Sequence, residues 1–91
     1  MASKNIHRYR NRIDIIAQLL DAASTPTTKT KMMYKTMVSY VQLKEYLLML
    51  TENDLIEYDK LDQSFTTTDK GIQFMKRYED LNKLIEAIPT K

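Results

Sequence analysis

Apolar side chains in the first quarter of the chain recur at intervals of three and four residues, the spacing of one helical face. This pattern predicts a first helix over about residues 5–23. Its expected core positions are Ile6, Tyr9, Ile13, Ile16 and Leu20. Segment 24–30 is rich in Ser and Thr and contains Pro26. Because the residue before a proline avoids the α region, this segment is predicted to be a loop.

Two further helices, joined by a tight turn, are predicted next. The first is expected over residues 31–36, with Thr30 as its N-cap. Met33 is expected to face the core, with Met32 or Tyr34 beside it.

The second helix of this pair is predicted over residues 40–52. Ser39 is a favourable N-cap residue, and Gln42 three positions later completes a capping-box pattern. Asn53 is expected to end the helix, because asparagine tolerates the left-handed conformation found there. The core stripe of this helix is predicted to be Leu43, Leu47 and Leu50, with Tyr46 beside them.

The last third of the chain predicts a hairpin followed by a long helix. Two short β-rich runs, 55–59 and 65–67, flank a polar tip over residues 60–64. Thr68 is the expected N-cap of the helix, which runs to about Ile88 and is closed by Pro89. Its apolar positions have the 4-3-4-3 spacing of a coiled-coil seam. They are Phe74, Tyr78, Leu81, Ile85 and Ile88.

These elements together predict a mainly α fold with a small β-hairpin. Two helices joined by a tight turn form a helix-turn-helix, and a following hairpin makes it winged. We therefore expect a winged helix-turn-helix over residues 1–68 and a C-terminal helix over residues 69–91, packed as one compact unit.

Charge is distributed unevenly along the chain. Residues 1–44 hold eight basic and two acidic side chains, whereas residues 45–91 hold six basic and ten acidic ones. The net charges of the two parts are therefore +6 and −4. Such asymmetry indicates that the first half faces a polyanion. The alternative interpretation is an ordinary solvated surface of mixed charge.

Three stretches of the sequence resemble a known family. They are the run 39–47 (SYVQLKEYL), the run 53–57 (NDLIE) and the run 65–71 (FTTTDKG). Together they resemble the small archaeal winged-helix DNA-binding proteins, among them the "ten-a" chromatin-associated family, over residues 9–88. Segment 29–34 also resembles that family's second helix. The resemblance implies DNA binding by a homodimer joined through an antiparallel coiled coil of the last helix.

The candidate DNA contacts lie on the helix pair and at the hairpin tip. Lys29, Lys31 and Lys35 are expected to contact phosphate, while Lys44 is the one basic residue on the outer face of helix 40–52. The remaining candidates are Ser39, Tyr40, Gln42, Lys60 and Gln63, with capping as the alternative role of Ser39.

The outer face of helix 40–52 departs from a simple basic pattern. It also carries Glu45, which phosphates would repel, and the apolar residues Val41 and Leu48. These two side chains suit contacts with thymine methyl groups or, equally, a protein-binding patch.

A second interface is predicted on the last helix. Beyond the reach of the winged unit, an apolar stripe would lack a partner within the chain, which favours a homodimer. The expected interface residues are Tyr78, Leu81, Leu84, Ile85 and Ile88. In the alternative, this helix folds back on the first helix beside Ile15 and Leu19. The basic cluster Arg8, Arg10 and Arg12 would contact either neighbouring DNA backbone or the acidic half of a partner chain.

Composition narrows the possible functions. The chain has no cysteine, a single histidine and a single glycine. It shows no phosphate-binding glycine loop, no nucleophile paired with a histidine, and no apolar run long enough to span a bilayer. We therefore expect a protein that is not an enzyme and that has no cofactor, metal or membrane partner. We also expect a cytoplasmic, nucleoid-associated location. The predicted function is double-stranded DNA binding as a homodimeric transcription regulator or chromatin-associated protein. The alternative is a winged-helix protein–protein interaction module.

Overall fold

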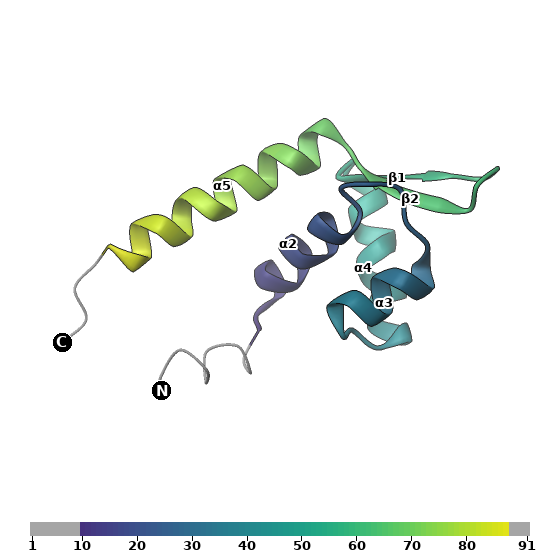
Figure 1. Cartoon of the computed structure of the whole chain (residues 1–91), viewed down its shortest axis with the longest axis horizontal. Helices are drawn as coiled ribbons and strands as arrows, with labels where there is room; N and C mark the ends of the chain where they lie inside the picture. The colour runs from purple at the N-terminus through teal and green to yellow at the C-terminus, as the bar shows by residue number, and fades with distance from the viewer. Residues whose placement is uncertain (1–9, 88–91) are drawn as a thin grey trace.

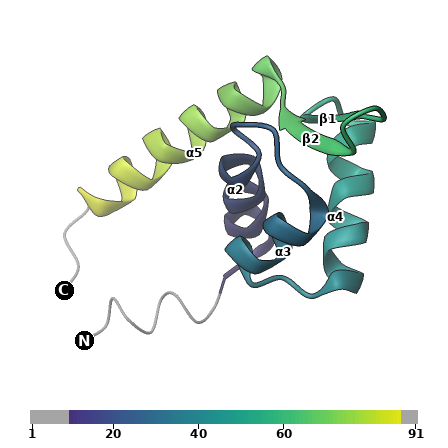
Figure 2. The same ribbon diagram turned by 45° about the vertical axis from the view of Figure 1, so that its right-hand side comes forward.

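The computed structural model describes residues 10–87 as a set of helices around a small hairpin (Figure 1). The hairpin lies at one end of α2, α3 and α4, and α5 returns from it across α2 (Figures 1 and 2). This arrangement confirms the predicted fold class. The elements are α2 (Arg12–Ala22), α3 (Lys29–Thr36), α4 (Tyr40–Glu52), β1 (Ile56–Asp59), β2 (Ser64–Thr67) and α5 (Asp69–Glu86).

The hydrophobic core lies where α2, α3, α4 and the hairpin meet. Removing these apolar side chains from water is the main force that holds the short helices together. The α4 stripe is confirmed, since Leu43, Leu47 and Leu50 are all buried. The largest fully buried side chains are Leu19, Leu20, Met32, Leu43, Leu50 and Ile56.

Helix α2 is shorter than the sequence pattern predicted. Asn11 caps it through a reciprocal capping box with Asp14, in which each side chain accepts from the other residue's backbone N–H, at 2.8 and 3.2 Å. The predicted helix over residues 10–11 is therefore wrong, because this cap begins the helix at Arg12; Ile6 and Tyr9 lie outside the described residues.

The buried face of α2 also differs from the predicted stripe. Ile16 and Leu20 are buried as expected, but Ile13 is half exposed and Leu19 is fully buried. Helix α2 packs against α3, β2 and α5 at once, so it buries a wider face than one 3-4 stripe.

The N-cap of α3 and the relative burial of its methionines differ from the prediction. Thr28, not Thr30, is the N-cap, and its hydroxyl accepts from the Lys31 backbone N–H at 3.3 Å. Met33 packs against the core as predicted, with Met32 beside it; Met32 is the more deeply buried of the two, and Tyr34 is exposed. Just before this cap, Thr27 pairs with Phe65 of the hairpin.

The boundaries of α4 agree with the prediction, with small differences in its caps. Ser39 is the N-cap, and its hydroxyl accepts from the Gln42 N–H at 3.2 Å. The Gln42 side chain meets the Ser39 hydroxyl at 3.4 Å rather than the Ser39 backbone N–H expected in a capping box. At the other end, Asp54 rather than Asn53 takes the left-handed conformation, with φ 61°.

The hairpin is attached to the helical core by backbone hydrogen bonds. Its antiparallel strands pair Ile56 with Thr67 and Tyr58 with Phe65. Thr27 bonds to Phe65 in both directions, at 3.0 and 2.7 Å. The Thr67 hydroxyl donates to the Leu20 carbonyl at 2.6 Å, and the Thr67 N–H donates to the Ala23 carbonyl at 2.8 Å. These bonds place the wing beside the start of α3.

Helix α5 begins in a tight junction with the hairpin. Thr68 is its N-cap, as predicted, and accepts from the Gly71 N–H at 3.1 Å. Gly71 lies so close to the loop before β1 that a Cβ there would be 2.4 Å from the Leu55 carbonyl oxygen and 2.5 Å from Thr67 Cγ2. Glycine is needed here because the backbones approach closely.

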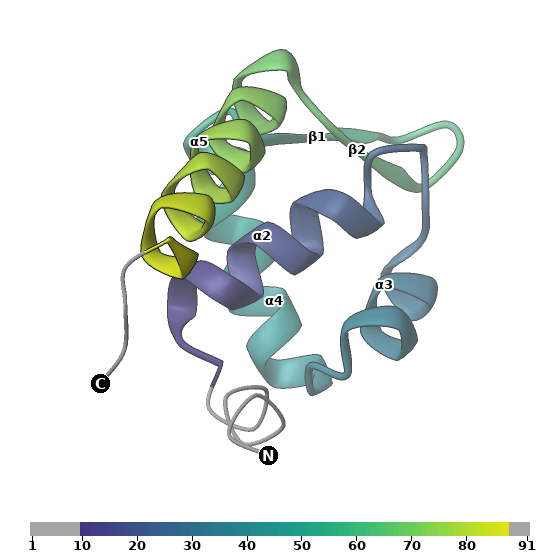
Figure 3. The same ribbon diagram turned by 60° about the vertical axis from the view of Figure 1, so that its left-hand side comes forward.

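The first half of α5 packs on the core, and its second half does not. Phe74 and Met75 pack against the core, and the Tyr78 hydroxyl donates to Asp14 on α2. The alternative in which α5 folds back on α2 therefore describes its first half, and Tyr78 has a partner within the chain. Figure 3 shows α5 crossing in front of α2, and its C-terminal part reaches beyond α2 in Figure 2.

Replacing Gly71 with alanine should destabilise the fold. Helix propensity alone predicts a gain of about 1 kcal/mol. The short contacts of an added Cβ predict instead a loss of about 2 kcal/mol, because backbone must move. Urea unfolding measures the difference. The exposed Gln73→Ala in the same helix is the control and should change stability by less than about 0.5 kcal/mol. A more stable Gly71→Ala protein would contradict the close approach.

The Tyr78–Asp14 hydrogen bond should make stability depend on alkaline pH. This bond is the largest cause, and burial the second, of a rise in the pKa of Tyr78 above its ordinary value of 10.0. Because the protonated phenol is favoured in the folded state, its contribution is complete below pH 10 and is lost as pH rises through the elevated pKa. Tyr78→Phe should cost about 1 kcal/mol at neutral pH. Its stability difference from the wild type should then shrink above pH 10, as followed by urea unfolding. An unchanged difference at all pH values would contradict this assignment.

Candidate nucleic-acid interface

The outward face of α4 is an exposed part of the helix-turn-helix. Helices α3 and α4 are joined through Met37 in the left-handed conformation, with φ 59°. Leu43, Leu47 and Leu50 face the core, which leaves the opposite side of α4 open to solvent. On that side Val41 is 66% exposed and Leu48 is 61% exposed. A helix with one face buried and the other open is the arrangement required for insertion into a groove.

Three of the predicted contact residues gather at the start of α4. The Lys29 ammonium lies 5.8 Å from the centre of the Tyr40 ring, and the Lys44 ammonium lies 5.7 Å from it. Lys29 is the first residue of α3, whereas Tyr40 and Lys44 are one turn apart on α4. The fold thus joins two separate segments into one cationic cluster, called here the Tyr40 cluster.

The hairpin adds a second wall beside the first turn of α3. A groove of about 520 Å³ runs between residues 28–30 and the strands, with Tyr58, Asp62 and Gln63 along its edge. Gln63 has a left-handed backbone, with φ 53°, and the Asp59 side chain holds the turn by accepting from the Leu61 N–H at 2.9 Å. Gln63 is therefore near Lys29, while Lys60 is exposed at the tip.

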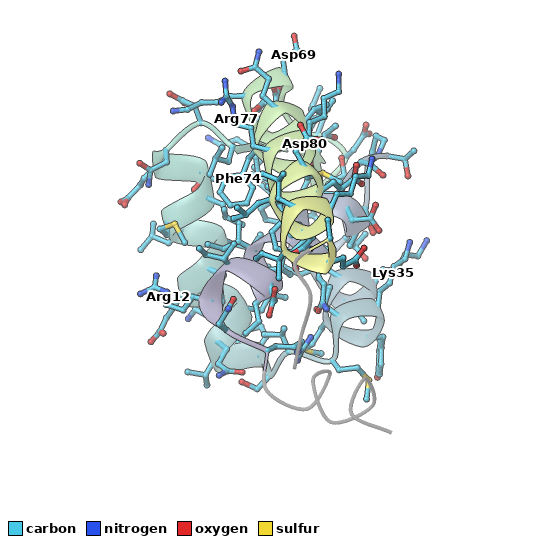
Figure 4. The ribbon with its side chains drawn as sticks, turned by 90° about the vertical axis from the view of Figure 1, so that its left-hand side faces the viewer. Arg12, Lys35, Asp69, Phe74, Arg77 and Asp80 are labelled. Atoms are coloured by element: carbon cyan, nitrogen blue, oxygen red, sulfur yellow. The ribbon has the colours of Figure 1, made fainter. Side chains whose placement is uncertain are left out.

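Lys35 lies apart from the Tyr40 cluster. It borders a groove of about 330 Å³ between α2, α3 and α5, whose other charged residues are Asp21 and Glu79. Figure 4 shows Lys35 on the opposite side of the molecule from Arg12. The three lysines of α3 thus do not form one surface, because Lys31 and Lys35 are four residues apart and share one side of the helix, whereas Lys29 lies on the other side.

The other predicted residues of the helix pair are exposed. Lys31 lies in the first turn of α3. Ser39 and Gln42 are hydrogen-bonded to each other, so the capping role of Ser39 is confirmed. Gln42 also borders a groove shared with Arg12 and Glu45.

The arginines act within the chain in a way that the sequence did not reveal. Arg10 donates to the Thr36 carbonyl at 2.5 Å and to the Met37 carbonyl at 3.3 Å, which satisfies the C-terminal end of α3. The Arg12 guanidinium lies 6.0 Å from the centre of the Tyr46 ring. Residues 10 and 36 are far apart in sequence, so no local pattern predicts this contact. Arg8 lies outside the described residues.

Acidic residues mark the far end of the same face. A groove of about 580 Å³ between α4 and the hairpin includes Asp54 and Glu57 next to Leu48. The Tyr40 cluster lies at the N-terminal end of α4, and these carboxylates lie beyond its C-terminal end. Lys29 also lines this groove, and the Lys70 ammonium donates to the Asn53 carbonyl at 2.9 Å, so both signs of charge are present at this end of α4.

The predicted dimer stripe is exposed in its described part. Leu81, Leu84 and Ile85 are all more than half exposed on the part of α5 beyond Tyr78. Ile88 lies outside the described residues.

Two further properties concern only residues 10–87. No helix in this part of the chain is long and apolar enough to cross a membrane. Within it, no three His, Cys, Asp or Glu side chains are grouped so as to hold a metal ion.

Comparisons with known proteins agree with this architecture. A search of curated protein sequences gives no match. Among solved structures, the fold is similar to that of Sso10a-2, a DNA-binding protein from Sulfolobus solfataricus, with a TM-score of 0.76 and 20% identity. The similarity covers 85% of this chain and 83% of that one. It confirms, at the level of the fold, the resemblance to small archaeal winged-helix proteins. The family model described as winged helix-turn-helix matches residues 9–86, and the chain belongs to that family.

Proposed function

We propose that the protein binds double-stranded DNA, with α4 in the major groove and the β1–β2 hairpin as its wing. The observation that carries this proposal is the Tyr40 cluster on the outer side of the helix-turn-helix. Membership of the winged helix-turn-helix family and the fold shared with a DNA-binding protein support it. The function is binding rather than catalysis.

The charge distribution suggests how α4 would meet the duplex. Lys29 and Lys44 would contact phosphates together at the Tyr40 cluster. The N-terminal turns of α4 would then read the bases, as they do in helix-turn-helix proteins generally. Val41 is placed to contact a thymine methyl group, and Gln42 to reach a base edge or a phosphate.

The other candidate contacts would be secondary. Lys60 and Gln63 lie in the exposed hairpin tip beside the same face and would add phosphate contacts, and Lys31 would contact phosphates from the side of α3 that carries Lys35. Ser39 acts first as a helix cap. Lys35 would contribute less than Lys29, because it lies beside Asp21 and Glu79 on another side of α3.

We further propose that the protein is a homodimer joined through the C-terminal half of α5. Leaving Leu81, Leu84 and Ile85 in water is unfavourable, since burying a large apolar side chain is worth roughly 1.5–3 kcal/mol. A second copy of α5 would bury them, together with Ile88, and would present two α4 helices to one duplex. Tyr78, bonded to Asp14, would lie at the edge of this interface.

Such a dimer suits either a transcription regulator or a chromatin-associated protein at the nucleoid. Genome-wide occupancy distinguishes them, since a regulator gives a few sharp sites and an architectural protein gives broad coverage. The exposed Val41 and Leu48 favour one other function, a protein–protein interaction module without DNA binding.

Binding to duplex DNA should be strongly salt-dependent. Each lysine that neutralises one phosphate contributes about 0.9 to the slope of log K against log salt. Lys29→Ala and Lys44→Ala should each lower this slope by about that amount, whereas Lys35→Ala, the matched control, should leave it nearly unchanged. Fluorescence anisotropy at several salt concentrations measures the slopes. If the wild type binds no duplex at low salt, DNA binding is wrong and the protein-interaction alternative is favoured.

Charges placed in the α5 stripe should separate the dimer. Leu81→Asp combined with Ile85→Asp should give monomers in light scattering, because buried unpaired carboxylates are strongly unfavourable. DNA affinity should fall with it, since the two halves no longer bind as a unit. Gln73→Asp, at an exposed position of the same helix, should remain dimeric. A wild type that is monomeric at tens of micromolar would rule out the dimer.

A further inference from the structure

The Tyr40 ring lies near two lysines that come from different helices. It is the first residue of α4 and is about half exposed, so its ring supports little of the core. Both ammonium groups lie within the distance of about 6 Å at which a cation is attracted to the face of an aromatic ring. Packing in the core therefore does not account for an aromatic ring at this position.

Holding the two lysines at the ring would reduce two unfavourable free-energy terms of DNA binding. A flexible lysine loses roughly 0.5–1.5 kcal/mol of side-chain freedom when an interface immobilises it. Two like charges brought together also repel each other, and the negative face of a nearby aromatic ring offsets part of that repulsion. Lysines already held at the ring would lose less freedom when a phosphate arrives.

We infer that Tyr40 is a positioning residue, whose ring holds Lys29 and Lys44 as a preformed pair for one stretch of DNA backbone. This inference rests on the proposed DNA binding. It makes the start of α4 a backbone anchor that ties α3 and α4 to the same phosphates. Base reading is then left to the residues of α4 that follow, such as Val41.

If Tyr40 positions the lysines, removing its ring should lower the DNA affinity without changing the number of phosphate contacts. Tyr40→Leu keeps both lysines, so the slope of log K against log salt should stay within about 0.3 of the wild-type value. Its affinity should nevertheless fall about fivefold, because the lysines must be ordered on binding. Tyr40→Phe keeps the ring and loses only the hydroxyl, so it should bind within twofold of the wild type.

A double-mutant cycle tests whether the ring acts through the lysines. Lys29→Ala should weaken binding about threefold less in the Tyr40→Leu protein than in the wild type, since the ring no longer positions Lys29 there. Lys31→Ala, on the same turn of α3, is the matched control and should cost the same in both backgrounds. Circular dichroism of each variant verifies that the fold is kept.

Proton NMR of the free protein gives a readout that needs no DNA. The ε-methylene protons of Lys29 and Lys44 should be shifted upfield by the ring current, and the shift should vanish in Tyr40→Leu but persist in Tyr40→Phe. Wild-type affinity in Tyr40→Leu, or equal weakening in Tyr40→Phe and Tyr40→Leu, overturns the positioning role while DNA binding stands. Absence of any wild-type binding overturns the proposed function itself, and the ring-current shifts then report only the pairing in the free protein.

Discussion

Helix α2 joins α3, the second strand and α5 in one packed unit. Its buried residues Leu19 and Leu20 provide much of the core. The hairpin is held by the bonds of Thr67 to α2 carbonyls, and α5 is held by the bond of Tyr78 to Asp14. The short helices and the two-stranded hairpin are each marginal alone, so their packing against one another is what allows them to form.

This packing leaves the outer face of α4 outside the hydrophobic core. Because α4 buries only its leucine stripe, the opposite side carries residues that the core does not require. The same packing places the first turn of α3 beside that side, so Lys29 comes next to Tyr40. The proposed DNA-binding surface is thus a consequence of how α3 crosses α4, and its chemistry depends on very few side chains.

This surface has few cations, and carboxylates lie among them. Lys29 borders the same groove as Asp54 and Glu57, and Glu45 follows Lys44 on α4. With only a few cations available, positioning them becomes more important than their number. A homodimer would double these contacts and so compensate for the small cationic surface of one chain.

Local sequence patterns were sufficient for the order of elements, for the limits of α4 and for its core stripe. They were also sufficient for the Ser39 and Thr68 caps, because period, caps and turn residues act within a few positions of each other. Tertiary packing decided the rest. It made Leu19 a core residue, moved the cap of α3 to Thr28, and engaged Arg10 with the end of α3. It also separated Lys35 from Lys29 and joined Lys29, Tyr40 and Lys44. These outcomes depend on contacts between residues distant in sequence, whose geometry is set only when the helices pack together.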